Sequence, residues 1–190
     1  DDAAMTVVRP TPADLVAAAG RTIPDVIAPD LRVLFCGINP GLYSGATGHH
    51  FARPGNRFWR VLHESGFTDR VFAPAEQTRL LEQGIGITNL VERTTAAAAE
   101  LTDEELRAGA DRLHERVALA RPRWLAVLGV IAYRFGFNDP AATVGRRPIR
   151  IAATRVWLLP NPSGLNAHYQ VPDLVAAFAA LRAAVDAEAD

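Results

Sequence analysis

The sequence predicts a single three-layer α/β domain, with a mostly parallel central sheet of about four strands and helices on both faces. The first observation is a set of four short, nearly continuous apolar runs, typical of strands buried on both faces, at 31–39, 84–90, 124–129 and 156–160. The second is that helical patterns separate these runs, an alternation typical of a parallel sheet. The third is size, because 190 residues, 49% of them hydrophobic, correspond to one average domain.

The chain begins with a segment that we expect to precede this domain. Residues 1–30 are rich in Ala, Pro and Asp, and within them Thr11 opens a short helical pattern that Gly20 ends. We therefore expect an N-terminal lead-in over 1–25 and one domain over 26–190. The first apolar run of the domain ends in a tight turn at 39–41, which reads NPG.

The predicted helices are marked by their first and last residues. Helix starts are predicted at Asn56, at Pro74, at Thr102 with Glu105 three residues on, and at Pro172. Gly66 and Pro122 end the first and third of these helices. Just before the last apolar run, residues 148–151 and 155–159 can pair as a hairpin.

Residue composition excludes several classes of protein. The single cysteine, Cys36, cannot form an internal disulfide or supply the thiolates of an iron–sulfur cluster. All twenty basic residues are Arg, which excludes P-loop NTPases that need a phosphate-loop lysine and enzymes that act through a lysine Schiff base. His49 and His50 would point apart on a strand, so we interpret them as loop residues rather than a metal pair. We expect no metal and no cofactor.

Two further patterns concern location and charge. No apolar run reaches the ~20 residues that cross a bilayer, and residues 1–4 lack the blocks of a secretory signal, so we expect a cytoplasmic monomer with no membrane partner. The net charge is −1, yet residues 143–170 hold four arginines and no acid. These are Arg146, Arg147, Arg150 and Arg155. They fit either a phosphate-facing side or a solvated loop with scattered charges.

Asparagines stand at three of the four predicted strand ends. Asn39 follows the first strand, Asn89 ends the second, and Asn161 follows the fourth. Ligands of open parallel sheets bind beyond the carboxyl ends of the strands. An uncharged amide offers donors and an acceptor, which suit an amide-like edge or a water molecule. Each asparagine alone is typical of a turn, but together they favour a binding site.

The motifs that carry these asparagines resemble a known family. Residues 37–42 (GINPGL) and 161–165 (NPSGL) are similar to the two signature motifs of the mismatch-specific branch of the uracil-DNA glycosylase superfamily, the MUG/TDG enzymes. The likeness extends from about 26 to 182 and includes 47–48, 51–52, 54, 56–59 and 66–70. The resemblance implies a monofunctional DNA glycosylase of base-excision repair, which flips uracil out of double-stranded DNA, preferentially at G:U mismatches, and hydrolyses its N-glycosidic bond.

The resemblance also implies roles for individual residues. Asn39 would be the catalytic residue that holds the attacking water. Base binding would involve the backbones of Ile38 and Phe51, the ring of Phe51, and the side chains of Asn89 and Asn161. The loop that meets DNA would contain Ser163 against the backbone, Gly164, the wedge residue Leu165 and Asn166. Such an enzyme would act in a bacterial-type cytoplasm, at the nucleoid.

Two positions, Asn89 and Asn166, depart from the family pattern, and a third, Gly41, differs from the strict uracil enzymes. Asn89 stands where the best-known bacterial mismatch enzymes have Lys, and an amide there could broaden activity on uracil or simply cap the strand. Asn166 stands where relatives often have Arg, and its shorter, neutral side chain would weaken the contact with the opposite DNA strand. Gly41 stands where strict uracil enzymes place a Tyr that blocks the 5-methyl group of thymine, so larger pyrimidine lesions could enter.

Alternative interpretations remain open at this stage. Residues 39–41 could cradle a phosphate in a nucleotide or nucleoside hydrolase of the same fold class. The chain could also be a module that senses mismatches without cleaving. Ser163 with His168 lacks the surroundings of a nucleophile elbow, so a serine hydrolase is improbable. Trp124, Trp157 and Phe135 are expected in the core.

Overall fold

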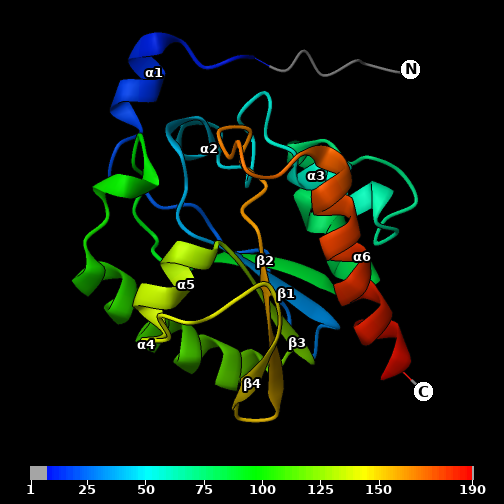
Figure 1. Cartoon of the computed structure of the whole chain (residues 1–190). Coiled ribbons are helices and arrows are strands. Elements are labelled where there is room, and N and C mark those ends of the chain that lie inside the picture. Colours follow the sequence, from blue (N-terminus) through cyan, green and yellow to red (C-terminus); the bar gives the residue numbers. More distant parts are fainter. Residues whose placement is uncertain (1–7, 190) are drawn as a thin grey trace.

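The computed structural model describes residues 8–189 and contains a five-stranded sheet (Figure 1). The strands are β1 (Val33–Gly37), β2 (Ile85–Asn89), β3 (Trp124–Leu128), β4 (Gly145–Ile151) and β5 (Thr154–Leu159). They lie in the order β2-β1-β3-β5-β4, and only β4 is antiparallel to its neighbour. The predicted α/β class is confirmed. The fifth strand is the first arm of the predicted hairpin, an exposed edge strand without an apolar run.

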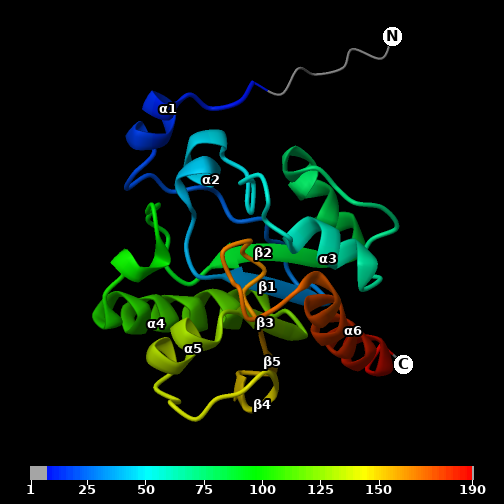
Figure 2. The ribbon, with the colours of Figure 1, turned by 45° about the horizontal axis from the view of Figure 1, so that its top comes forward.

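Helices cover both faces of this sheet (Figure 2). One face carries α3 (Phe58–Glu64) and α6 (Val171–Ala187), and the other carries α4 (Asp103–Ala120) and α5 (Val130–Gly136). Successive residues of a strand point to opposite faces. Phe35 therefore packs in the core beneath α3 and α6, while its neighbour Leu34 packs in the core beneath α4 and α5. The Phe35 ring lies 5.9 Å from that of Phe178, which secures α6 to the sheet.

Local sequence accounts for most helix ends. The Thr102 hydroxyl accepts from the Glu105 amide and the Glu105 carboxylate accepts from the Thr102 amide, as the capping box predicts. Asn56 Oδ1 accepts from the Phe58 amide at the start of α3. Pro74–Gln83 (η1) is a 3₁₀ rather than an α segment, and a short 3₁₀ turn, Ala98–Glu100 (η2), precedes α4. Helix α2 (Leu42–Thr47) follows directly after the NPG turn and was not among the predicted helices.

The segment before β1 packs on the rest of the domain. Thr11 caps α1 (Pro12–Ala17), and the chain then runs back to the sheet. Val26 forms an antiparallel bridge with Ile87 at the outer edge of β2. The expectation about residues 1–4 lies outside the described residues. Within 8–189, no helix has the length and apolar content to cross a membrane.

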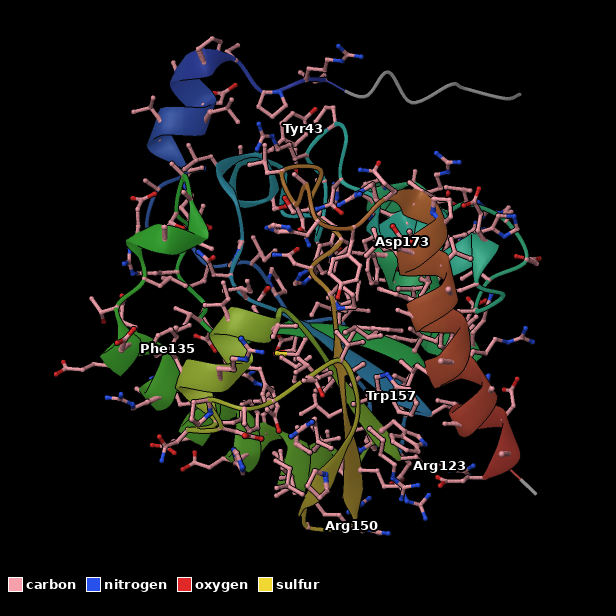
Figure 3. All side chains as sticks on the ribbon, viewed as in Figure 1. Tyr43, Arg123, Phe135, Arg150, Trp157 and Asp173 are labelled. Atoms are coloured by element: carbon pink, nitrogen blue, oxygen red, sulfur yellow. The ribbon has the colours of Figure 1, made fainter. Side chains whose placement is uncertain are left out.

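The four arginines of 143–170 lie on the β4–β5 hairpin, away from the pocket described below. The turn of this hairpin is at the amino-terminal end of β5, opposite to Asn161, and Figure 3 shows Arg150 there. Arg147 pairs with Asp139, and Arg155 pairs with Glu188. None of the four lines the pocket, which favours the interpretation as scattered surface charges. The expectation that Phe135 is a core residue is wrong, because it lies on the outer surface of α5 and is 41% exposed.

Candidate active site

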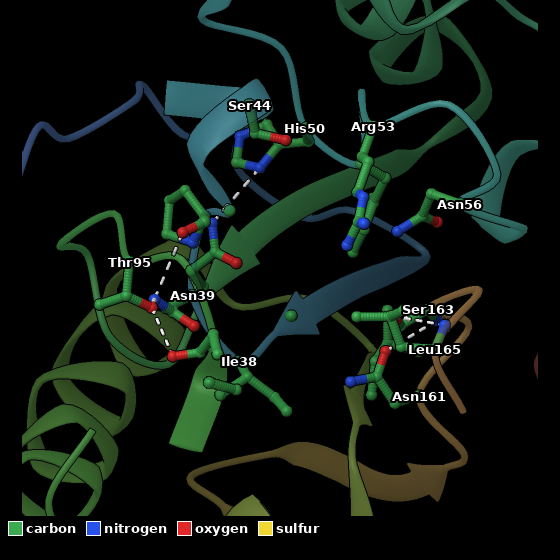
Figure 4. Close-up of a pocket in the computed structure, with 18 of the residues that line it drawn as sticks. Ile38, Asn39, Ser44, His50, Arg53, Asn56, Thr95, Asn161, Ser163 and Leu165 are labelled. Carbon is green, nitrogen blue, oxygen red and sulfur yellow. Dashed lines mark hydrogen bonds between the residues drawn. The ribbon is translucent and has the colours of Figure 1, made fainter. Parts of the chain in front are cut away.

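A pocket opens beyond the carboxyl ends of the four parallel strands, at the position where ligands of such sheets bind (Figure 4). The chain crosses to one side of β1 to form β2 and to the other side to form β3. Side chains from all four strand ends line the pocket: Ile38 and Asn39 after β1, Asn89 in β2, Leu128 in β3, and Asn161 after β5. The structure thus brings the three predicted asparagines to one place.

Asn39 is held in a single orientation by its surroundings. Its Nδ2 donates to the carbonyl of Arg93 across 3.0 Å and to the hydroxyl of Thr95 across 2.7 Å. Thr95 in turn donates its own proton to the carbonyl of Ala97, so its oxygen must accept from Asn39. A flipped amide would place oxygen against the carbonyl of Arg93. The Asn39 Oδ1 is therefore left as a hydrogen-bond acceptor for a molecule in the pocket.

Phe51 lies beside β1 in an unusual backbone conformation. Its φ is +52°, a region that non-glycine residues seldom occupy. The ring stacks on Phe58 with a centroid distance of 4.2 Å, which fixes its position. No acceptor among residues 8–189 receives the Phe51 amide proton, which is therefore available to a ligand. A Cβ built at Gly37 would lie only 3.2 Å from this ring, so a glycine is needed there.

Asn89 is buried and contacts His50. His50 lies in the loop after α2, as expected, but its side chain is only 2% exposed and lines the pocket. Its Nε2 lies 2.8 Å from the carbonyl of Pro24, which can only accept, so Nε2 carries the proton. His50 Nδ1 is then an acceptor, 3.4 Å from Asn89 Nδ2. Burial lowers the pKa of His50, which favours this neutral form.

The loop after β5 is shaped largely by its own polar side chains. Asn161 Oδ1 accepts from the Ser163 amide, and Ser163 Oγ accepts from the Leu165 amide. Asn166 donates to the carbonyl of Asn161 and accepts from the amide of His168. The Asn166 side chain thus uses both its nitrogen and its oxygen within the loop. The Nδ2 group of Asn161 remains available to a molecule in the pocket. Leu165 projects at the rim and is 73% exposed.

Several pocket residues had no predicted role. Ile23 and Ser44 line the wall, Thr95 orients Asn39, and Arg53 and Asn56 lie at the mouth near Leu165. Arg53 is exposed and lines the pocket, so its positive charge can attract a phosphate group there. Spacing gave no signal for Thr95, because it lies in a loop without periodicity. Arg53 could have been found as a basic residue between the two family motifs.

The chemistry of the pocket is that of a neutral amide site. None of the described lining residues is a carboxylate, so no acidic side chain can act as a general base on a bound molecule. The polar groups are the side-chain amides of four asparagines, the His50 imidazole, hydroxyls and backbone N–H groups, and Arg53 adds one charged group at the mouth. Such groups can hold a water molecule and read the donor and acceptor pattern of a planar ring. The fold and the site together define an α/β protein with an amide-lined pocket at the carboxyl ends of its parallel strands.

Comparison with known proteins identifies the family. The model of the uracil DNA glycosylase superfamily matches residues 24–183. The chain therefore belongs to the uracil DNA glycosylase superfamily, whose members are DNA N-glycosylases. Among solved structures, its fold is similar to the solution NMR structure of a Methanosarcina acetivorans protein named for a proposed uracil DNA glycosylase activity. The TM-score is 0.56 at 22% identity, over 86% of this chain and 98% of that one.

Proposed function

We propose that this chain is a monofunctional glycosylase of base-excision repair that removes uracil from double-stranded DNA, preferentially from G:U mismatches. The observation that carries the proposal is the oriented amide of Asn39. Its donors are used by Arg93 and Thr95, and its acceptor remains for a water molecule. Membership of the superfamily supplies the substrate class, since the fold alone does not define a reaction.

The geometry supports a hydrolysis in which the base leaves with negative charge. Cleavage of a glycosidic bond passes through an oxocarbenium-like sugar. The oxygen of water attacks the anomeric carbon, the electron pair of the C–N bond leaves with uracil, and the proton that the water gives up passes through solvent to the uracil anion. Donors aimed at the uracil oxygens stabilise the negative charge while it develops. The Phe51 amide is such a donor. A neutral Asn39 positions the water but activates it little, so we expect a modest chemical rate.

The substrate range follows from flipping and from Asn89. Flipping costs a few kcal/mol and least at a mismatch, which favours G:U. Asn89 offers a donor and an acceptor to the uracil edge, so we propose that A:U and single-stranded uracil are also processed. Gly41 has open space beside it, which admits larger pyrimidine lesions. Single-turnover rates on G:U, A:U and single-stranded uracil, before and after Asn89→Ala, test this range. Equal rates for both proteins on all three would contradict it.

One assay separates this function from its alternatives. The protein is incubated with a duplex containing one G:U pair, and the product is treated with alkali. A glycosylase leaves an alkali-labile break at the uracil. A mismatch-sensing module leaves the duplex intact, and a nucleotide hydrolase acts only on free nucleotides. An intact strand after alkali would overturn the proposal.

The proposal includes the absence of lyase activity. Strand cleavage by β-elimination requires an amine that forms an imine with the abasic sugar, and the sequence contains no lysine. The product should be an intact abasic site, released by a monomer. Borohydride added during the reaction should trap no covalent protein–DNA adduct. A trapped adduct would contradict this part of the proposal.

A further inference from the structure

A single guanidinium joins the two segments that border the mouth of the pocket. Arg57 precedes α3, next to Asn56, which lines the pocket. Its Nε donates to the carbonyl of Pro162, and its Nη1 donates to the carbonyl of Tyr169. Its Nη2 donates to the carbonyls of Ser163 and Asn166. One side chain therefore gathers four carbonyls of a loop that has no regular secondary structure.

The backbone strengthens the same junction. The amide of Arg57 also donates to the carbonyl of Pro162, across 3.1 Å. Gly164 approaches Gly55 so closely that a Cβ built on it would lie 2.6 Å from the Gly55 carbonyl oxygen. The segment 53–57 and the loop 161–169 are thus fitted to each other. Leu165 and Arg53 lie side by side at this junction, where both line the same small hollow.

The charge of Arg57 is not neutralised by a carboxylate. Within residues 8–189, no ion pair includes it, although eleven other arginine–carboxylate contacts are present. Hydrogen bonds from a charged donor contribute more than neutral ones, so four carbonyls on one guanidinium hold the loop firmly. The remaining positive charge lies next to Ser163. A phosphodiester that approaches Ser163 would be attracted to it.

We propose that Arg57 is a positioning residue of the loop 161–169, which we call the wedge loop. It fixes Ser163 and Leu165 in their DNA-binding arrangement before DNA arrives, so that the ordering cost is met during folding and not during binding. This inference rests on the proposed function of the chain on duplex DNA. In this role Arg57 contacts neither the base nor the sugar.

Two variants separate the geometry of Arg57 from its charge. Arg57→Lys keeps the charge but cannot direct donors to four carbonyls, whereas Arg57→Gln loses both. The matched control is Arg60→Lys, one turn along α3, where the exposed guanidinium contacts Glu64. In Arg57→Lys, the amides of 163–169 should exchange with solvent deuterium about tenfold faster or more, while those of α6 stay protected. Single-turnover excision should fall at least about tenfold more on a G:U duplex than on single-stranded uracil.

The salt dependence of duplex binding gives a further expected result. Arg57→Lys should retain the wild-type slope, and Arg57→Gln should have a shallower one. Unchanged amide exchange in Arg57→Lys, or equal losses on duplex and single strand, would overturn the inference. The exchange measurement does not depend on activity. A wild-type protein that excises no uracil would overturn the proposed function, while the positioning role would still be decided by exchange.

A third variant, Gly164→Ala, covers the case in which Arg57→Lys does not fold. Gly164→Ala leaves Arg57 in place but adds a methyl group against Gly55, which displaces the wedge loop from the segment 53–57. It should reproduce the loss that is selective for duplex substrate. A Gly164→Ala protein with wild-type rates on both substrates would contradict the inference.

Discussion

The side-chain amide of Asn39 donates a 2.7 Å hydrogen bond to the hydroxyl of Thr95, a residue 56 positions further along the chain. This bond joins the turn after β1 to the loop after β2. It decides which end of the Asn39 amide faces the pocket, and with it whether the pocket offers an acceptor or a donor to a water molecule. The orientation of the Asn39 amide therefore depends on a residue in a separate loop of the chain.

Removal of Asn39 or of its partner should reduce excision to different extents. Asn39→Ala removes the water-holding acceptor, and single-turnover excision of G:U should fall about 100-fold or more. Thr95→Val removes one orienting bond and should cost about 3- to 10-fold, since a neutral hydrogen bond contributes about 0.5–1.5 kcal/mol. DNA affinity and thermal stability should change little. If Asn39→Ala excised uracil within a few-fold of wild type, its assigned role would be lost.

Gly37→Ala should impair excision through crowding rather than through the backbone. The added Cβ would lie 2.7 Å from Asn89 Oδ1 and 3.2 Å from the Phe51 ring, so one of them must move. We expect a loss of about 1–3 kcal/mol in the free energy of unfolding, together with a loss of activity. The loss of stability should shrink in an Asn89→Ala background, which removes the nearest atom. An equal loss in both backgrounds, measured by urea unfolding, would exclude this contact as the cause.

Leu165→Ala should affect duplex substrates selectively. If Leu165 fills the space of the flipped nucleotide, its loss removes about 1–3 kcal/mol of stacking compensation on G:U duplex. Single-stranded uracil has no gap to fill and should be affected much less. Leu119→Ala is the control, because Leu119 is a comparably exposed leucine, on α4 and outside the pocket. Equal losses on duplex and single strand would count against a wedge.

His50 should make stability depend on pH. Burial lowers its pKa below the ordinary value of 6.5, so the unfolded chain binds the proton more readily than the folded protein. The contribution of neutral His50 is complete above pH 6.5 and is lost as the pH falls toward the lowered pKa. Urea unfolding between pH 8 and 5 should show a smaller decline in His50→Gln than in wild type. An unaltered decline in His50→Gln would exclude His50 as its source.

The sequence predicted the buried strands well and the exposed ones poorly. β1, β2 and β3 are buried on both faces. Such strands need apolar residues at successive positions, so a continuous apolar run predicts them. β4 lies at an edge, where solvent replaces one neighbour, and its arginines carry no strand pattern. The helix ends at Asn56 and Thr102 were predictable because capping is a local interaction.

Site residues divide in the same way. Asn39, Asn89 and Asn161 were predictable because they stand at strand ends, and parallel strands bring their ends together. His50 was not, because its burial results from the return of the chain near Pro24, far away in sequence. Arg57 also looked like any surface arginine on a helix. Its partners lie more than 100 residues away, and no local pattern reports them.

Both outer edges of the sheet are unsuited to pairing with another chain. At β2, the bridge between Val26 and Ile87 already uses the edge amide and carbonyl. At β4, Pro148 offers no N–H, and the register is irregular between Arg146 and Arg150. A strand from a second molecule would therefore find no continuous ladder on either side. Concentrated solutions of this protein should therefore not aggregate by joining the edges of their sheets.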